Sequence, residues 1–124
     1  MQARRNQVLV VDGANVVGSV PDGWWKDRAG AARRLHERLL VADTGFDEIV
    51  LVLEGQAKAG VRAGRDAHVR TVHASRDGDS EIRAQARRAA EAGDHVLVVT
   101  ADRMLAANVA PAQVLSPSWL LDRI

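Results

Sequence analysis

Short runs of consecutive apolar residues alternate along this chain with longer amphipathic segments. The runs Gln7–Val11, Glu48–Leu53 and His95–Thr100 have the length and the β-branched content of fully buried strands. Asp27–Ala42 and Glu81–Ala92 carry apolar residues at helical spacing, which predicts amphipathic helices packed on a sheet. Strands that alternate with helices at this spacing predict βαβ units and a mainly parallel sheet.

Weaker patterns predict the remaining elements. Ala67–Ala74 alternates polar and apolar residues imperfectly, which predicts a weak strand at an edge of the sheet. Gln56–Asp66 is rich in glycine and basic residues, which predicts either a mobile basic loop or a frayed helix. Asp102–Asn108, Gln113–Leu115 and Ser118–Arg123 predict a short helix, a short strand and a helical turn. Since no repeat or linker interrupts the pattern, we expect one domain over residues 1–124.

Composition narrows the class of protein. The chain has 124 residues, of which 47% are hydrophobic, so a core can form. No apolar run is long enough to span a bilayer, and the start has no signal-peptide pattern, so we expect a cytoplasmic protein without membrane association. Without cysteine there is neither a disulfide nor a thiolate metal site. The net charge is only +1, but all basic residues except Lys26 and Lys58 are arginine, which reflects codon usage, phosphate recognition, or both.

Acidic residues lie where predicted strands end or helices begin. Asp12, Glu54 and Asp102 follow the three strongest strands, and Asp77 and Asp79 precede the helix at residues 81–92. In a parallel sheet all strand ends of one sense share one edge, so these carboxylates are expected to meet there. Converging carboxylates repel one another unless a cation lies between them. The pattern therefore predicts a metal-dependent enzyme.

Each of these residues also has a structural explanation. Asp12 alone is typical of a turn, and Glu54 is typical of a solvent-facing loop entrance. The acids before the second helix, together with Ser80, are typical of a helix cap, and Asp102 is typical of a cap of the short helix that begins at Arg103. Separate caps, however, do not require several acids to occur together at one sheet edge. In the functional interpretation Asn15 holds the loop, or the carboxylate of Asp12, in place.

The residue types favour one kind of chemistry. Mg²⁺ binds carboxylate oxygens and keeps several waters, which suits hydrolysis of a phosphodiester. Zinc is disfavoured because the four histidines are scattered, and we interpret them as structural. The chain lacks the phosphate loop, the dinucleotide-binding glycine pattern and the nucleophilic serine elbow. Of the aromatic pair Trp24 and Trp25, one is predicted to pack where the first helix meets the sheet and the other to stack on a base; Trp119 is predicted to be a packing anchor.

The stretches Asp12–Val17, Gly78–Ile82 and Val99–Arg103 together resemble the NYN domain family of PIN-like nucleases, and within it the bacterial YacP-type branch. The resemblance covers most of the chain, with the motifs in the family's order. It implies a PIN-like three-layer α/β/α fold with a central, mainly parallel sheet. It also implies a ribonuclease site that depends on Mg²⁺ or Mn²⁺.

The resemblance further implies a role for individual residues. By motif position the metal-binding carboxylates would be Asp12, Asp79 and Asp102, while Asn15 matches the asparagine of the motif; Glu54 stands where relatives often place aspartate. The residues expected to assist are Glu54, Asp77, Ser80 and Thr100, and those expected to contact phosphates are Arg62, Arg65 and Arg103. The expected activity is endoribonucleolytic cleavage of RNA, with ribosome association open. The alternatives are a non-catalytic RNA- or ribosome-binding module on the same fold, and a nucleotide phosphohydrolase.

Overall fold

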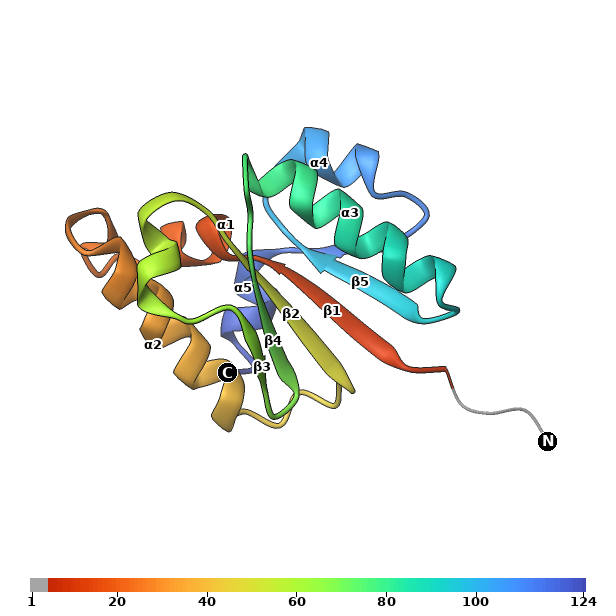
Figure 1. Ribbon diagram of the computed structural model, residues 1–124, viewed down its shortest axis with the longest axis horizontal. Helices are drawn as coiled ribbons and strands as arrows, with labels where there is room; N and C mark the ends of the chain where they lie inside the picture. Colours follow the sequence, from red (N-terminus) through yellow and green to blue (C-terminus); the bar gives the residue numbers. More distant parts are fainter. Residues whose placement is uncertain (1–4) are drawn as a thin grey trace.

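The computed structural model describes residues 5–124 and has a central sheet with the strand order β3-β4-β2-β1-β5-β6 (Figure 1). The strands are β1 (Gln7–Asp12), β2 (Glu48–Leu53), β3 (Gly64–Asp66), β4 (Val69–His73), β5 (His95–Val99) and β6 (Gln113–Leu115). All neighbouring strands are parallel except β3, which runs antiparallel to β4. The α-helices are α1 (Gly13–Gly18), α2 (Arg28–Val41), α3 (Gly78–Glu91), α4 (Arg103–Asn108) and α5 (Pro117–Leu121), and the 3₁₀ helices are η1 (Trp24–Lys26) and η2 (Gly55–Gly60).

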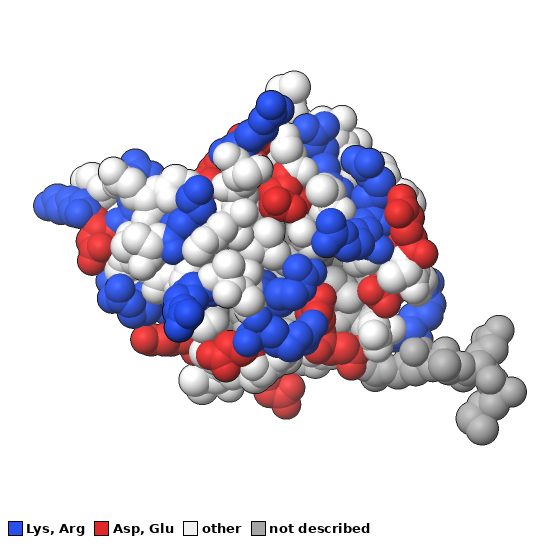
Figure 2. All heavy atoms as spheres, viewed as in Figure 1, with Lys and Arg blue, Asp and Glu red and all other residues white. Residues whose placement is uncertain are grey.

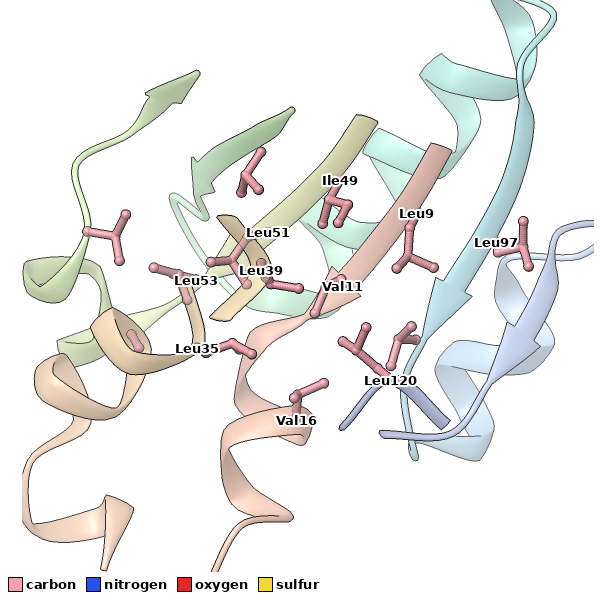
Figure 3. Close-up of a cluster of buried hydrophobic side chains, with 14 residues drawn as sticks. Leu9, Val11, Val16, Leu35, Leu39, Ile49, Leu51, Leu53, Leu97 and Leu120 are labelled. Atoms are coloured by element: carbon pink, nitrogen blue, oxygen red, sulfur yellow. The ribbon is translucent and has the colours of Figure 1, made fainter. Parts of the chain in front are cut away.

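The helices cover both faces of the sheet because the strands are apolar on both sides. Successive strand residues point to opposite faces, so Leu9 and Val11 join a first core cluster with α1, α2 and α5 (Figure 3). Val8 and Val10 join a second core cluster with α3 and α4. The result is three layers, which confirms the expected α/β/α fold with a mainly parallel sheet.

Two expectations about the weaker segments are corrected. The strand expected at Ala67–Ala74 forms as β4, but it lies inside the sheet between β3 and β2. The edge position belongs to β3, within the segment that we expected to be a loop or a frayed helix, and η2 occupies the start of that segment. The sequence also did not predict α1, which begins directly after β1. Among the residues that the structure describes, no helix is long and apolar enough to cross a membrane.

The centre of the sheet contains a topological switch point. Strand β1 pairs with β2 on one side and with β5 on the other, so the strands that follow β1 lie first on one side of it, as β2, β3 and β4, and then on the other, as β5 and β6. Ligands of open α/β sheets bind in the crevice outside the carboxyl ends of such strands. Asp12 is the last residue of β1, and Thr100 directly follows β5. The acidic motifs therefore lie at the edge where this fold class forms its sites.

The tight turn from β1 into α1 depends on a glycine. A Cβ on Gly13 would lie 2.6 Å from the backbone oxygen of Val52 and 2.8 Å from a side-chain carbon of Leu53. Contacts this short require a shift of β2 or of α1. Because Gly13 has no side chain, α1 can begin in contact with β2. This close packing also sets the orientation of the preceding residue, Asp12.

We expect Gly13→Ala to destabilise the protein by about 1–3 kcal/mol, the usual cost of overpacking. The matched control is Gly18→Ala in the same helix, where the nearest atom to an added Cβ belongs to Trp24 at an ordinary 3.8 Å. Because alanine favours helix, this variant should be neutral or slightly more stable. Urea unfolding of both variants measures the difference, and equal stability of the two would contradict the close approach at Gly13.

Candidate functional site

Asp12 is the central residue of the candidate site. Its side chain caps the N-terminus of α1 and is only 4% exposed. One carboxylate oxygen, Oδ2, accepts hydrogen bonds from Asn15 Nδ2 at 2.7 Å and from Thr100 Oγ1 at 2.8 Å. The other, Oδ1, accepts the backbone N–H of Asn15 at 3.3 Å and no further hydrogen bond from residues 5–124. One oxygen is therefore held tightly by the protein, and the other keeps capacity for a further partner.

Asn15 and Thr100 connect β1 to the segment after β5. Asn15 Oδ1 accepts the backbone N–H of Ala101 at 3.2 Å, so its amide bridges Asp12 and that segment. Thr100 Oγ1 donates to Asp12 and accepts the backbone N–H of Asp102 at 3.1 Å. These bonds run across the switch point. They fix the orientation of the Asp12 carboxylate and the start of α4 together.

Asp102 caps α4. Its Oδ1 accepts the backbone N–H groups of Met104 at 2.9 Å and of Leu105 at 3.1 Å. This is the helix-cap role that the sequence left open for this residue. The other oxygen, Oδ2, accepts no hydrogen bond from the residues that the structure describes. Capping thus occupies one of the two oxygens.

Glu54 joins the end of β2 to the beginning of α3. Its Oε2 accepts the backbone N–H of Gly78, the first residue of α3, at 2.8 Å. A Cβ on Gly78 would lie 3.2 Å from the Glu54 carboxyl group, which is tighter than most such contacts. Glu54 therefore faces the candidate site instead of solvent, and it fixes the position of the first turn of α3.

The two aspartates at the start of α3 differ in their surroundings. Asp77 is the N-cap and accepts Ser80 N at 2.7 Å and Ser80 Oγ at 3.1 Å. These two hydrogen bonds hold the pKa of Asp77 below its ordinary value. Asp79 accepts no hydrogen bond within residues 5–124. Asp77 therefore has the bonds of a structural cap, and Asp79 does not.

The pKa values show that the carboxylates influence one another. Burial raises the pKa of Asp12 against the lowering effect of Thr100 and Asn15, and the charges of Asp79 and Glu54 raise it further. Partial desolvation raises the pKa of Asp79, and so do the charges of Asp102, Asp77 and Glu54. The structure thus brings together the acids that the sequence placed at one edge. Within residues 5–124, however, no three acidic or histidine side chains are close enough together to hold one metal ion.

The comparisons with known proteins concern the fold. No family model matches the chain, and no curated protein matches its sequence. Among solved structures, the crystal structure of Rae1 (YacP) from Bacillus subtilis matches with a TM-score of 0.67 at 19% sequence identity. The match covers 94% of this chain and 73% of that one. The chain has a YacP-like fold. This agrees with the PIN-like arrangement that the sequence motifs implied.

The structure separates the three arginines expected to contact phosphates. Arg103 is the first residue of α4 and is exposed directly beside Asp102. Arg62 is exposed after Val61, whose carbonyl is hydrogen-bonded to His73 at the carboxyl end of β4. Arg65 forms an ion pair with Glu48, the first residue of β2, and so lies toward the opposite end of the sheet from Glu54. The YacP-like fold thus does not bring Arg65 to the carboxylates.

Arg83 lies near the carboxylates, although it is not among the residues that the sequence predicted for the site. It is four residues after Asp79 on α3, and its charge lowers the pKa of that aspartate against the effect of the surrounding acids. Residues four apart on a helix share a face, so this spacing was the available signal. Arg83 is therefore the basic residue that the structure adds to the site.

The aromatic residues and histidines lie mostly outside the site. Trp24 is half-buried in η1 under the guanidinium of Arg28, 4.8 Å from its ring centre, whereas Trp25 is 57% exposed. Trp119 packs against the first core cluster and against Phe46, as expected. Hydrogen bonds to other parts of the chain hold three of the histidines, namely His68, His73 and His95. Base stacking on Trp25 stays a prediction.

Proposed function

We propose that this chain is a metal-dependent endoribonuclease that hydrolyses RNA phosphodiester bonds at Asp12, Asp79 and Asp102. The observation that carries the proposal is the buried carboxylate of Asp12 at the switch point, with Asp79 and Glu54 close enough to raise its pKa. The YacP-like fold supports it, because it agrees with the fold that the sequence motifs imply.

The donor set suits Mg²⁺ or Mn²⁺. Hard cations prefer carboxylate oxygens, and Mg²⁺ is commonly held by one or two carboxylates together with waters and substrate phosphates. Binding of Mg²⁺ therefore does not require three acidic side chains to converge on the ion. Asp12 and Asp79 would hold the ion, and Asp102 would act through one of the ion's waters. The added charge would offset the desolvation and the neighbouring carboxylate charges that raise the pKa of Asp79. When bound, the ion supplies polarisation of a phosphoryl oxygen and activation of a water.

The other residues position these groups. Asn15 and Thr100 hold one oxygen of Asp12 and leave the second available. Glu54 holds the first turn of α3, so that Asp79 projects from a fixed helix end. Arg103, exposed beside Asp102, is suited to a phosphate of the substrate. In this arrangement the hydrogen bonds within the protein fix the positions of the carboxylates, and their remaining oxygens are available to the ion.

Removal of divalent metal is the direct test. We expect the purified protein to cleave an end-labelled RNA in Mn²⁺ or Mg²⁺, to stop in EDTA, and to recover when the metal is restored. Without a cation, the clustered carboxylates repel both one another and the RNA phosphates. Gel electrophoresis of the products measures cleavage, and calorimetric titration measures binding of the metal.

The alternatives give different results in the same assays. RNA binding without cleavage and without metal binding would replace the proposal with a non-catalytic RNA- or ribosome-binding module. Hydrolysis of free nucleoside triphosphates, but not of RNA, would replace it with a nucleotide phosphohydrolase. Either result rejects the endoribonuclease.

A further inference from the structure

A second feature of the surface lies on the α3 side of the sheet, toward the amino-terminal ends of β5 and β6. It is a hollow of about 540 Å³ between α3, the first half of β5 and the segment that joins α4 to β6. This volume is within the range of small-molecule sites in proteins. Its floor is apolar and belongs to the second core cluster, with Ala86, Val96 and Val109.

The rim of the hollow is basic. Arg83, Arg87 and Arg5 line it, against one acid, Asp94. Arg5 donates from Nε to the backbone oxygen of Gly93 at 3.0 Å and from Nη2 to that of Asp94 at 3.1 Å, so carbonyl groups orient its guanidinium without neutralising its charge. Among residues 5–124, neither Arg83 nor Arg87 is ion-paired with an acidic side chain. The hollow thus combines an apolar floor with three guanidinium groups against one carboxylate.

A row of side chains on one face of α3 leads from the candidate site to the hollow. Asp79, Arg83 and Arg87 follow one another at intervals of four residues, which places each about 6 Å further along the helix axis. Arg83 is the middle residue of this row: it lines the hollow and lies one helical turn from Asp79. Figure 2 shows Lys and Arg side chains close together over the region of α3 and α4, with acidic side chains between them.

We propose that this hollow binds a nucleotide of the RNA strand that lies further along the strand from the cleaved bond. Arg83 and Arg87 contact successive phosphates that lead away from the carboxylates, and the base lies against the apolar floor. Guanidinium groups suit phosphate oxygens, and a base offers a flat apolar face to such a floor. The inference rests on the proposed function for the position of the cleaved bond, but the binding itself requires no metal.

The test is fluorescence anisotropy of a short labelled oligouridylate in EDTA, where cleavage is absent. We expect Arg87→Ala to weaken binding about tenfold, the scale of one charge-assisted contact. We also expect the slope of log affinity against log salt to fall by about 1. Arg88→Ala is the matched control, because Arg88 is exposed on the same last turns of α3 but does not line the hollow. It should bind like the wild type, and Arg87→Lys should recover part of the loss.

The outcomes separate this inference from the proposed function. Equal binding by Arg87→Ala, Arg88→Ala and the wild type overturns the hollow as an RNA site, even where metal-dependent cleavage is found. Equally tight binding of a free uridine nucleotide also overturns it, because the hollow would then be a mononucleotide site. Loss of binding in Arg87→Ala alone supports the hollow whether or not the protein cleaves RNA. Amide chemical shifts provide a second readout: changes at Val96 and Gln113 on adding the oligouridylate support the site, and their absence overturns it.

Discussion

Asp12→Asn should reduce metal-dependent RNA cleavage by about 10³-fold or more, because it removes the charge of the most buried carboxylate of the site. The amide oxygen of an asparagine can still accept from Asn15 Nδ2 and Thr100 Oγ1, so the connection between β1 and β5 is preserved. The thermal midpoint should stay close to that of the wild type. The variant loses the bond from the Asn15 backbone, but it also loses the burial cost that raises the pKa of Asp12.

The matched control for this prediction is Asp43→Asn. Asp43 is exposed in the segment before β2, at the opposite end of the sheet from the candidate site. Its substitution removes the same charge and should leave cleavage unchanged. Initial rates on an end-labelled RNA with Mn²⁺, from identically purified proteins, provide the comparison. Equal cleavage by Asp12→Asn and the wild type would identify a contaminating nuclease and reject the assigned role.

The parts of the fold that the sequence predicted are those fixed by burial. Strands β1, β2 and β5 are apolar on both faces, and α2 and α3 have one apolar face, so a local pattern is sufficient to identify them. Helix α1 was missed because it is only six residues long and its start depends on contacts with β2. The edge strand β3 was missed because its three residues are all exposed and contribute no apolar pattern.

In the candidate site, too, local patterns predict some features, and others depend on tertiary contacts. The position of Asp12, Glu54 and Asp102 at one edge could be predicted, since parallel strands place their ends together. The partners of each side chain could not. Glu54 accepts the N–H of Gly78 because of where α3 packs relative to the end of β2. No local sequence pattern determines that packing position. Arg65 is the opposite case. The sequence predicted that it contacts phosphates at the site, but the antiparallel pairing of β3 with β4 places it at the other end of the sheet.

Substitutions of the two aspartates at the start of α3 should distinguish a helix-capping residue, Asp77, from a metal-binding residue, Asp79. The pKa of Asp79 is raised by desolvation and by Asp102, Asp77 and Glu54, so its ionised form is less favourable in the folded protein than in the unfolded chain. Asp79→Asn should therefore raise the thermal midpoint in EDTA at neutral pH while lowering cleavage by about 10²-fold or more. The hydrogen bonds from Ser80 lower the pKa of Asp77, so its ionised form stabilises the fold. Asp77→Asn should lower the midpoint slightly and leave cleavage near that of the wild type.

The dependence on pH distinguishes these effects from a general loss of packing. The stabilisation by Asp77 is present above the ordinary aspartate pKa of 3.8 and is lost as pH falls through the lowered value. The destabilisation by Asp79 is present above its raised pKa and disappears once pH falls below 3.8. Both differences from the wild type should thus shrink in acid, whereas a packing defect would persist. If Asp77→Asn abolished cleavage and Asp79→Asn retained it, the N-cap would be the metal ligand and the roles assigned here would be reversed.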